Sequence, residues 1–342
     1  MLHEPHFAGC DVSKNTLDIC LSDGTRLRHK QVPNTPKGHA TLVAWLTQAT
    51  DRTEGRTVRI AVEATGTYGF DLLLALHAAE AVELMVVNPR AARRFAEAQM
   101  TRSKTDRVDA ASLAEFARRM AFVAWQPPEA AVLELRAIAR RIQALTVEAT
   151  RERNRLGHAQ ATASTPAVVL NDIEVNLRHL ERRLSEMERQ AMKVVRSHER
   201  LRTAYDHVTS VKGIADKTAV MLLPELLVLP GGLSVRQWVA QAGLDPRRHQ
   251  SGASVEKRER ISKVGNAHIR RALFMPALVA VRWEPHVRAF YDHLLARGKQ
   301  PRVALVAVMR KLLHAIYGMF KHGADFEGEK FYRMPENVAV SA

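Results

Sequence analysis

Residues 7–21 read FAGCDVSKNTLDICL, two apolar and partly alternating runs that are separated by Ser13-Lys14-Asn15. Such runs are typical of short β-strands. Asp23-Gly24 follows and favours a hairpin turn before a third run over residues 26–32. This stretch therefore predicts an antiparallel meander of three strands at the beginning of the chain.

Helical and apolar patterns alternate after the meander. Residues 36–47 have a helical period, and the apolar run over residues 58–62 is typical of a buried parallel strand. A helix is predicted over residues 68–79, a strand over 83–87, and a helix from Pro89, because proline suits the first helical turn. The order βββαβαβα is that of the ribonuclease H-like fold, an α/β architecture with a mixed sheet.

The chain is long and strongly basic. Its 342 residues exceed the roughly 250 residues that a single core usually reaches, so we expect more than one domain. Lys and Arg number 51 against 36 Asp and Glu, which gives a net charge of +15. This balance favours a polyanionic partner, and nucleic acid is the first candidate.

Several other classes of protein are disfavoured. No apolar run approaches the roughly 18 residues of a membrane span, and residues 1–7 lack the pattern of a secretory signal. Cys10 and Cys20 are the only cysteines and form no CxxC motif, which argues against a zinc site or a disulfide framework. We therefore expect a cytoplasmic protein that does not enter a membrane.

The second half of the sequence has the pattern of long helices. Trp125-Gln126-Pro127-Pro128 ends the first domain. An apolar stripe then consists of Leu135, Ile138, Ile142 and Leu145, and a heptad seam consists of Ile173, Leu177, Leu180, Leu184, Met187, Ala191 and Val194. The seam predicts a coiled coil, which either packs as an internal hairpin or pairs two molecules. We place the domains at residues 1–126, 127–204 and 205–325, followed by a flexible tail over residues 326–342.

Two segments of the last domain have features of nucleic-acid binding. Residues 208–219 contain Lys212-Gly213 and resemble the turn of a helix-hairpin-helix element, in which backbone N–H groups approach a phosphate. An ordinary glycine-containing connection between helices has the same pattern. A polar loop over residues 245–263 and the helix after it are dense in cations, namely Arg247, Arg248, Lys257, Arg258, Arg260, Lys263, Arg270 and Arg271. A phosphate backbone is the expected target of this density.

Four carboxylates fall at related places in the predicted first domain. Asp106 and Asp109 lie three residues apart at the start of a helix and share one face. Ser103 and Asp106 also fit a capping box, and capping explains this pair more readily when it is considered alone. Asp11 and Glu63 belong to strands that neighbour each other in the predicted sheet, so the four acids are expected to converge. Four carboxylates can hold two Mg²⁺ ions about 4 Å apart for phosphoryl transfer.

Short blocks along the chain carry a family resemblance. They are Gly9–Lys14 with Leu17-Asp18, Val62–Tyr68, Asn88-Pro89, Lys104–Ala110, Lys212–Ile214, Ala242–Pro246, Gln250–Gly252, Ile261–Asn266 and Ile269–Leu273. With these blocks in this order, the chain resembles the DEDD transposases of insertion sequences, also described as bridge-RNA-guided recombinases.

The resemblance implies two sites and several partners. It implies an N-terminal RuvC-like domain whose metal-binding tetrad is Asp11, Glu63, Asp106 and Asp109. It also implies a C-terminal transposase domain with Ser251 as nucleophile. Mg²⁺ is the implied cofactor, DNA and a guide RNA are the implied partners, and the implied assembly is a homodimer that pairs into a tetramer.

Without the resemblance, Ser251 fits a linker serine beside a glycine, and Ser254 and Ser262 are rivals in the same basic stretch. This chain has Ala253 where relatives usually carry a second glycine, and Cys10 where they usually carry an aliphatic residue. The leading hypothesis is an insertion-sequence transposase or recombinase that cuts and rejoins DNA with Mg²⁺ and a serine nucleophile, guided by a structured non-coding RNA. The alternatives are a metal-dependent, structure-selective nuclease that uses water, and a basic scaffold that binds nucleic acid without catalysis.

Overall fold

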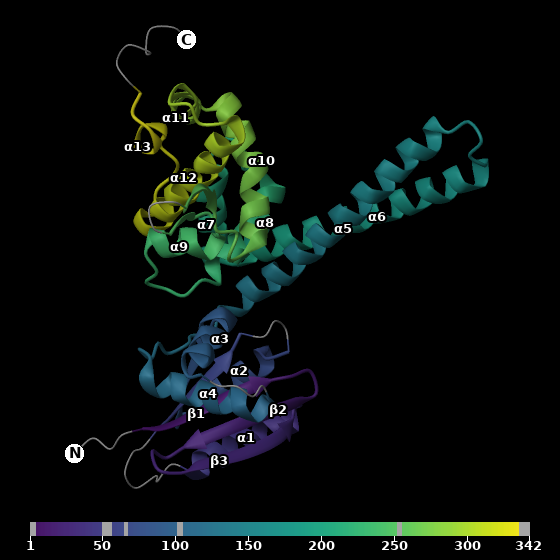
Figure 1. Cartoon of the computed structure of the whole chain (residues 1–342). Helices are drawn as coiled ribbons and strands as arrows, with labels where there is room; N and C mark the ends of the chain where they lie inside the picture. Colours follow the sequence, from purple (N-terminus) through teal and green to yellow (C-terminus); the bar gives the residue numbers. More distant parts are fainter. Residues whose placement is uncertain (1–4, 50–56, 65–67, 101–104, 252–254, 335–342) are drawn as a thin grey trace. The chain divides into compact units, whose positions relative to one another are not determined.

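A computed structural model covers the chain and is drawn in Figure 1. The structure describes residues 5–49, 57–64, 68–100, 105–251 and 255–334, with the side chains of residues 248–259 left outside the description. The chain divides into two compact units, residues 1–127 and residues 128–342.

The first unit is built on a five-stranded mixed sheet. Its elements are β1 (His6–Val12), β2 (Thr16–Ser22), β3 (Leu27–Pro33), α1 (Pro36–Ala49), β4 (Val58–Glu63), α2 (Phe70–His77), β5 (Val82–Val87), α3 (Pro89–Ala98) and α4 (Asp106–Arg119). The strands lie in the order β3-β2-β1-β4-β5. β1 pairs antiparallel with β2 and parallel with β4, and β4 is also parallel to β5. The predicted succession of strands and helices is confirmed by these bounds.

Different helices cover the two faces of this sheet. On one face, Leu42 of α1 and Leu76 of α2 pack against a cluster that includes Ile60 of β4. On the other face, Leu113 of α4 packs in a cluster with Ala61 of β4. Successive residues of a strand point to opposite faces, so β4 is buried on both sides. This double burial explains the apolar run from which β4 was predicted.

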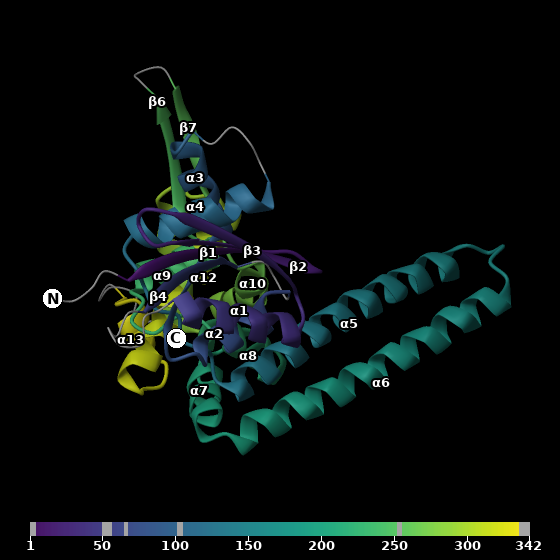
Figure 2. The same cartoon turned by 90° about the horizontal axis from the view of Figure 1, so that it is seen from below.

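The second unit is helical apart from one ribbon of two strands. Its elements are α5 (Ala130–Ala161), α6 (Ala167–Ser197), α7 (Glu199–Thr209), α8 (Asp216–Leu227), α9 (Val235–Ala242), β6 (Pro246–Ser251), β7 (Val255–Ile261), α10 (Ala267–Trp283), α11 (Pro285–Ala296), α12 (Pro301–His322) and α13 (Gly328–Phe331). α5 and α6 form a long hairpin that extends from the other helices of this unit (Figures 1 and 2). Those helices share one apolar core, which includes Leu222, Leu273 and Leu312.

The apolar stripes of α5 and α6 pack against each other inside the hairpin. One buried cluster contains Leu135, Ile142 and Leu145 of α5 with Leu180, Leu184, Ala191 and Val194 of α6. Internal packing therefore accounts for most of the predicted seam. Pairing of two molecules through the rest of the hairpin stays a prediction.

The segment over residues 245–263 is a β-ribbon and not the loop predicted from its polarity. β6 and β7 pair antiparallel, with a register shift between Arg247 and His249. The ribbon projects from the helices of the second unit (Figure 2). Apart from Pro246, Val255 and Ile261 at the strand ends, its two strands consist of polar or charged residues, so the alternation that usually indicates a strand is absent.

The prediction of a flexible tail from residue 326 is wrong for the residues up to 334. α13 lies within this range, and Phe331 is buried in the core of the second unit. The Nζ atom of Lys311 in α12 lies 4.3 Å from the ring centroid of Phe290 and 5.3 Å from that of Phe331. These cation–π contacts fasten α13 to α11 and α12.

α12 is long and apolar enough to cross a membrane by length and composition. Arg310 and Lys311 interrupt its apolar residues, so α12 meets this criterion without containing an uninterrupted apolar run of that length. Leu305, Val308, Leu312 and Ile316 of α12 are buried in the core of the second unit. A core helix satisfies the same criterion, and this burial explains why α12 is apolar.

Candidate active site

Two acidic residues stand at one edge of the sheet in the first unit. Asp11 is the penultimate residue of β1, and Glu63 is the last residue of β4. The strands are parallel, with Cys10 opposite Val62. Because parallel strands end at the same edge, the register places Asp11 and Glu63 side by side as the strands leave the sheet.

α4 brings the other two acids to this edge. Asp106 and Asp109 occupy its first turn, and the hydroxyl of Thr105 accepts a hydrogen bond from the Val108 N–H, 3.3 Å away. Thr105 is thus the N-cap, which corrects the capping box predicted for Ser103 and Asp106; Ser103 lies outside the described residues. The two aspartates are therefore free of the reciprocal capping role, although acids in a first turn also suit the helix dipole.

Gly9 of β1 lets α4 approach the sheet closely. A Cβ atom at this position would lie 2.2 Å from the carbonyl oxygen of Ala110 and 2.3 Å from the backbone nitrogen of Ala114. Any side chain other than hydrogen would push the helix away from the strand. The glycine two residues before Asp11 therefore sets the distance between Asp11 and the first turn of α4.

The four acids share one electrostatic neighbourhood. The pKa of Asp11 is raised to about 6, mainly by burial and then by the charges of Asp106, Asp109 and Glu63, in that order. Asp11 is thus close enough to the other three carboxylates to be repelled by each of them. Among the described residues, no group of three or more His, Cys, Asp or Glu is arranged to hold a metal ion as it stands.

Asp18 is a fifth acid that the sequence analysis did not place in the site. It lies directly opposite Asp11 in the antiparallel register of β1 and β2, and its charge also raises the pKa of Asp11. The Nε2 atom of Gln31 donates hydrogen bonds to both carboxylate oxygens of Asp18, each at 3.0 Å. The signal available in the sequence was the hairpin pairing, because residues opposite each other in a hairpin point to the same face.

Ser251 belongs to the second unit, at the outer end of the ribbon. It is the last residue of β6 and pairs with Val255 of β7, while residues 252–254, including Ser254, lie outside the described residues. The side chain of Ser251 is likewise outside the description, as are those of Arg248, Lys257 and Arg258. The backbone therefore places Ser251 at the tip of a ribbon whose six-residue strand spans about 20 Å.

Ser262 lies at the opposite end of the ribbon. Its hydroxyl donates a hydrogen bond to the carboxylate of Asp245 and accepts one from the Val264 N–H at 3.3 Å. The backbone N–H of Ser262 also donates to the carbonyl of Asp245, at 2.8 Å. Ser262 is therefore engaged in closing the base of the ribbon.

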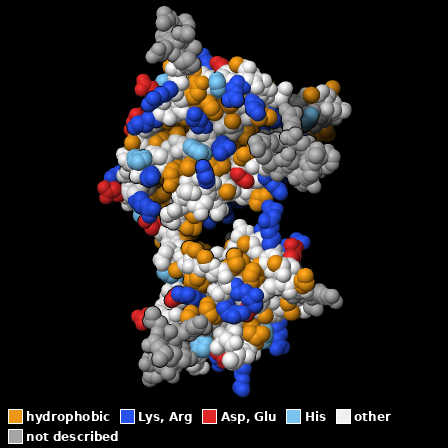
Figure 3. All heavy atoms as spheres, turned by 60° about the vertical axis from the view of Figure 1, so that its left-hand side comes forward, with side chains coloured by type: hydrophobic (Ala, Val, Ile, Leu, Met, Phe, Trp, Pro, Cys, Tyr) orange, Lys and Arg blue, Asp and Glu red, His pale blue; other side chains and the backbone are white. Residues whose placement is uncertain are grey.

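The predicted cations around the ribbon have different surroundings. Arg247 and Arg260 face each other across the ribbon and are exposed, and Lys263 and Arg271 are exposed as well. Arg270 instead donates from Nη1 to the carbonyl oxygen of Ala242 at 2.7 Å, so it helps to hold α9 and α10 together. Lys and Arg side chains are spread over both units on the face drawn in Figure 3.

The connection between α7 and α8 contains Lys212 and Gly213, as predicted for a helix-hairpin-helix turn. Gly213 has φ +103°, and a Cβ atom there would lie 2.8 Å from the carbonyl oxygen of Pro276 in α10. The Nζ atom of Lys212 lies 3.9 Å from a carboxylate oxygen of Glu284. Close packing against α10 is thus sufficient to explain the glycine, whether or not a phosphate also approaches this turn.

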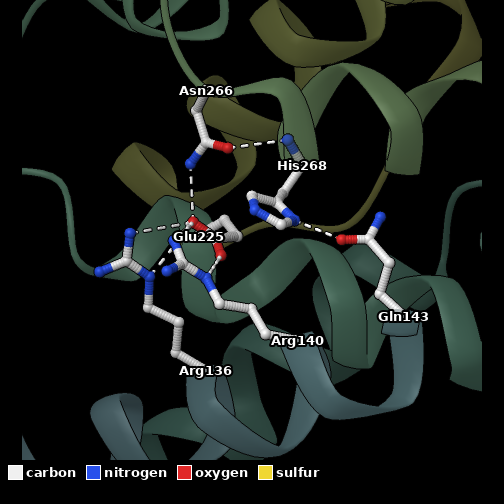
Figure 4. A network of polar contacts seen from close by, with 6 residues as sticks. All are labelled: Arg136, Arg140, Gln143, Glu225, Asn266 and His268. Atoms are coloured by element: carbon white, nitrogen blue, oxygen red, sulfur yellow. Dashed lines mark hydrogen bonds and ion pairs between the residues drawn. The ribbon is translucent and has the colours of Figure 1, made fainter. Parts of the chain in front are cut away.

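A buried ion-pair network joins α5, α8 and α10 (Figure 4). The side chain of Glu225 is 1% exposed and accepts from Arg140 at 2.8 Å and from Asn266 at 2.6 Å. Burial alone would raise its pKa, but these bonds and Arg136 lower the pKa of Glu225 to about 2. No pattern in the sequence predicts this network, because its members lie far apart along the chain.

His268 extends this network towards α5. Asn266 caps α10 by accepting from the His268 N–H at 2.8 Å, and the His268 ring contacts the side-chain oxygen of Gln143. Burial lowers the pKa of His268, which favours the neutral ring. The network therefore connects the base of the α5–α6 hairpin to α8 and α10 through hydrogen bonds and ion pairs.

Comparisons with known proteins match both units. Residues 8–160 match the DEDD transposase family of IS110 type, and residues 205–292 match the transposase family IS116/IS110/IS902. A pilin gene-inverting protein of Moraxella bovis is 28% identical over 326 residues, which cover 94% of this chain and 97% of that protein. An uncharacterized 43.6 kDa protein of insertion element IS110 from Streptomyces coelicolor is 30% identical over 135 residues, covering 40% of this chain and 32% of the relative.

Proposed function

Since the chain belongs to the IS116/IS110/IS902 family of transposases, whose members act on DNA, we propose that it cuts and rejoins DNA strands through a covalent protein–DNA intermediate. In this proposal Ser251 is the nucleophile. The acids of the first unit, Asp11, Glu63, Asp106 and Asp109, form a Mg²⁺ site that acts on the same reaction. The observation that carries the proposal is the electrostatic coupling of Asp11 to the other three acids.

The chemistry of the four acids fits divalent magnesium. All of them offer carboxylate oxygens, the ligands that Mg²⁺ prefers. Burial and the neighbouring carboxylates both raise the pKa of Asp11, so a cation bound beside it would favour the ionised form. Bound Mg²⁺, in two ions as we propose, would supply electrostatic stabilisation to the charge that develops during phosphoryl transfer. The residues themselves would hold the cation at the sheet edge, and Asp18 would add to the negative potential that attracts it.

The strand order supports a ribonuclease H-like, RuvC-like assignment for the first unit. β1, β2 and β3 form an antiparallel meander. The parallel strands β4 and β5 are added on the other side of β1, which gives the order β3-β2-β1-β4-β5. We further propose domains at residues 1–126, 127–204 and 205–325, with the α7–α8 connection serving as a helix-hairpin-helix element. In that role the backbone near Lys212 and Gly213 would approach a phosphate without reading bases.

The reaction proposed for Ser251 balances without an oxidant or a cofactor. Its Oγ atom forms a bond to a backbone phosphorus as the bond from phosphorus to the leaving sugar oxygen breaks. The serine proton passes to solvent or a nearby base, and the leaving oxygen takes up a proton. A strand-end hydroxyl then attacks the phosphoserine, which restores the phosphodiester and releases the serine.

Target choice by a structured guide RNA and assembly of homodimers into tetramers are also part of the proposal. Both come from the family resemblance. The net charge of +15 supports a nucleic-acid partner but does not distinguish RNA from DNA.

Trapping of the covalent intermediate tests the proposal. The full-length protein would be incubated with element-end DNA and Mg²⁺ and then denatured, and a protein–DNA adduct would be isolated and digested to map the phosphoserine. We expect an adduct at Ser251 that Ser251→Ala abolishes. Ser262→Ala is the matched control, because Ser262 lies in the same ribbon but closes its base.

Cleaved strands without an adduct would overturn the serine mechanism and favour hydrolysis by water. An adduct mapped to Ser254 or Ser262 would keep the covalent mechanism but reassign its nucleophile. DNA binding without any cleavage, left unchanged by Asp106→Asn, would favour a scaffold that has no catalytic role.

A further inference from the structure

A groove lies between the base of the β6–β7 ribbon and the first half of α12. Its volume is about 630 Å³. Four cations line it: Arg260 and Lys263 from the ribbon side, and Arg302 and Arg310 from α12. The two residues from α12 were not among the nucleic-acid-binding residues expected from the sequence. They lie 42 and 50 positions beyond Arg260, in a largely apolar helix.

The charge of this groove is unbalanced within the described part of the chain. Its lining includes no Asp or Glu. None of the four cations forms an ion pair or hydrogen bond with another described side chain. Arg136 and Arg140, by contrast, both form ion pairs with buried Glu225. The groove thus presents positive charge that no described side chain pairs with.

An apolar floor increases the effect of that charge. Leu244 is 1% exposed, and Val303 and Val306 of α12 line the groove beside the arginines. Charges next to apolar surface are less well screened than charges in bulk water, so they repel one another more strongly. A bound anion relieves this repulsion, and arginine suits phosphate because its guanidinium can donate two parallel hydrogen bonds.

The cations continue from the groove onto the ribbon. Arg247 lies opposite Arg260 and is exposed. From Arg260, β7 runs five residues to Val255, which pairs with Ser251 at the tip. Five residues of strand span about 17 Å. This length corresponds to several phosphates of a nucleic-acid strand, so an extended polyanion fits the path better than an isolated phosphate ion does.

We propose that this groove binds the phosphate backbone of the nucleic-acid strand on which the ribbon acts, with Arg302 and Arg310 as its contacts from α12. The proposal rests on the proposed function only in taking nucleic acid as the partner. The groove holds the strand at a fixed distance from the tip of the ribbon. It recognises the backbone and therefore carries no base preference.

Binding measurements with the full-length protein test the groove directly. Affinities of wild type, Arg302→Gln, Arg310→Gln and the double variant would be measured for a labelled DNA duplex and an RNA duplex of equal length over a series of salt concentrations. Each lost phosphate contact is expected to lower the slope of log K against log salt by about 1. Arg236→Gln in α9 is the matched control, since this exposed arginine lies outside the groove and no partner is recorded for it among the described residues.

The variant Val303→Trp distinguishes binding inside the groove from binding by the general positive charge of the surface. This variant fills the hollow and leaves all four cations in place, so it should weaken binding with little change in the salt slope. The melting temperature of every variant shows whether the fold is kept. Loss in the DNA arm assigns the groove to DNA, and loss in the RNA arm assigns it to RNA.

Unchanged affinity and salt slope in both arms for the double variant would overturn the proposal. A changed oligomeric state with unchanged nucleic-acid binding would overturn it as well and would assign the groove to a protein interface. Failure of the proposed function has a different signature. Wild type would form no adduct at Ser251, while the arginine variants would still bind nucleic acid more weakly than wild type.

Discussion

Asp106 belongs to the cluster of carboxylates around Asp11 in the first unit. Its repulsion contributes to the raised pKa of Asp11, so the ionised cluster costs stability near neutral pH. We expect Asp106→Asn to raise the free energy of unfolding at pH 7 by up to about 1 kcal/mol and to abolish recombination. Urea unfolding and an excision assay measure the two effects.

Asp71→Asn is the control for this substitution. Asp71 lies in the first turn of α2, where its charge is favourable to the helix dipole, so the same change should not stabilise the protein. If Asp106→Asn destabilised the protein, or if the variant still recombined DNA, the hypothesis that the acids are clustered for catalysis would be contradicted. In that case their role would be structural.

Gly9 is the residue on which the approach of α4 to β1 depends. A methyl group there would meet backbone atoms of Ala110 and Ala114 at distances no real Cβ contact shows. We expect Gly9→Ala to cost about 3 kcal/mol or more, because overpacking against backbone cannot be relieved by a rotamer change. Thermal and urea unfolding measure this cost.

Gly157 provides the opposite case at a helical position. Nothing lies within 4 Å of a Cβ atom built on Gly157 in α5. Gly157→Ala should therefore stabilise the protein by about 0.5–1 kcal/mol through helix propensity alone. If both glycine variants changed stability equally, close packing at Gly9 would not be the cause.

At the scale of elements, the polar network around Glu225 makes the stability of the second unit sensitive to acid. The pKa of Glu225 is lowered from 4.5 to about 2 in the folded state. Its contribution is therefore fully present above pH 4.5 and is lost as the pH falls towards 2, and it amounts to about 3 kcal/mol. Urea unfolding at pH 6, 4 and 3 should show a progressive loss.

Glu225→Gln removes the titrating group and leaves the partly exposed Arg136 and Arg140 without the carboxylate that they share. We expect this variant to be less stable than wild type by about 3 kcal/mol at pH 7, with the difference shrinking as the pH approaches 2. An equal pH dependence in wild type and variant would show that another group controls acid unfolding.

The elements that were predicted correctly are those whose burial produces a recognisable pattern in the local sequence. β4 was predictable because it is buried on both faces, and α4 because Asp106 and Asp109 begin it. The β6–β7 ribbon was predicted as a loop because its side chains are charged and its pairing leaves no apolar alternation. Polarity distinguished the segment from the core, but it did not reveal the backbone pairing.

Contacts between distant residues limited the prediction of the site. Asp11, Glu63 and α4 could be brought together because strand order fixes which strand ends are neighbours. The partners of Glu225 lie 85 and 89 residues away on α5, and no pattern in the sequence links them. The choice of Ser251 among the serines of the ribbon came from family resemblance, since a serine beside a glycine has no distinctive chemistry of its own.

At the scale of the whole molecule, the acids and the serine belong to different units. Asp11, Glu63, Asp106 and Asp109 lie in residues 1–127, and Ser251 lies in residues 128–342. Two sites that serve one reaction give substitution effects that do not add, because loss of either group already stops the same step. Two sites with separate activities give independent losses.

The double variant Asp106→Asn with Ser251→Ala distinguishes these cases. We expect each single variant and the double variant to reduce strand exchange to the same residual level. The measurement is the recombination frequency in cells that contain equal amounts of each protein. Asp292→Asn is the control for expression and charge, because Asp292 lies on α11 and belongs to neither site. Retained DNA cleavage by Ser251→Ala, combined with its loss in Asp106→Asn, would mean that the acids alone cut DNA with water and that Ser251 has no part in the chemistry.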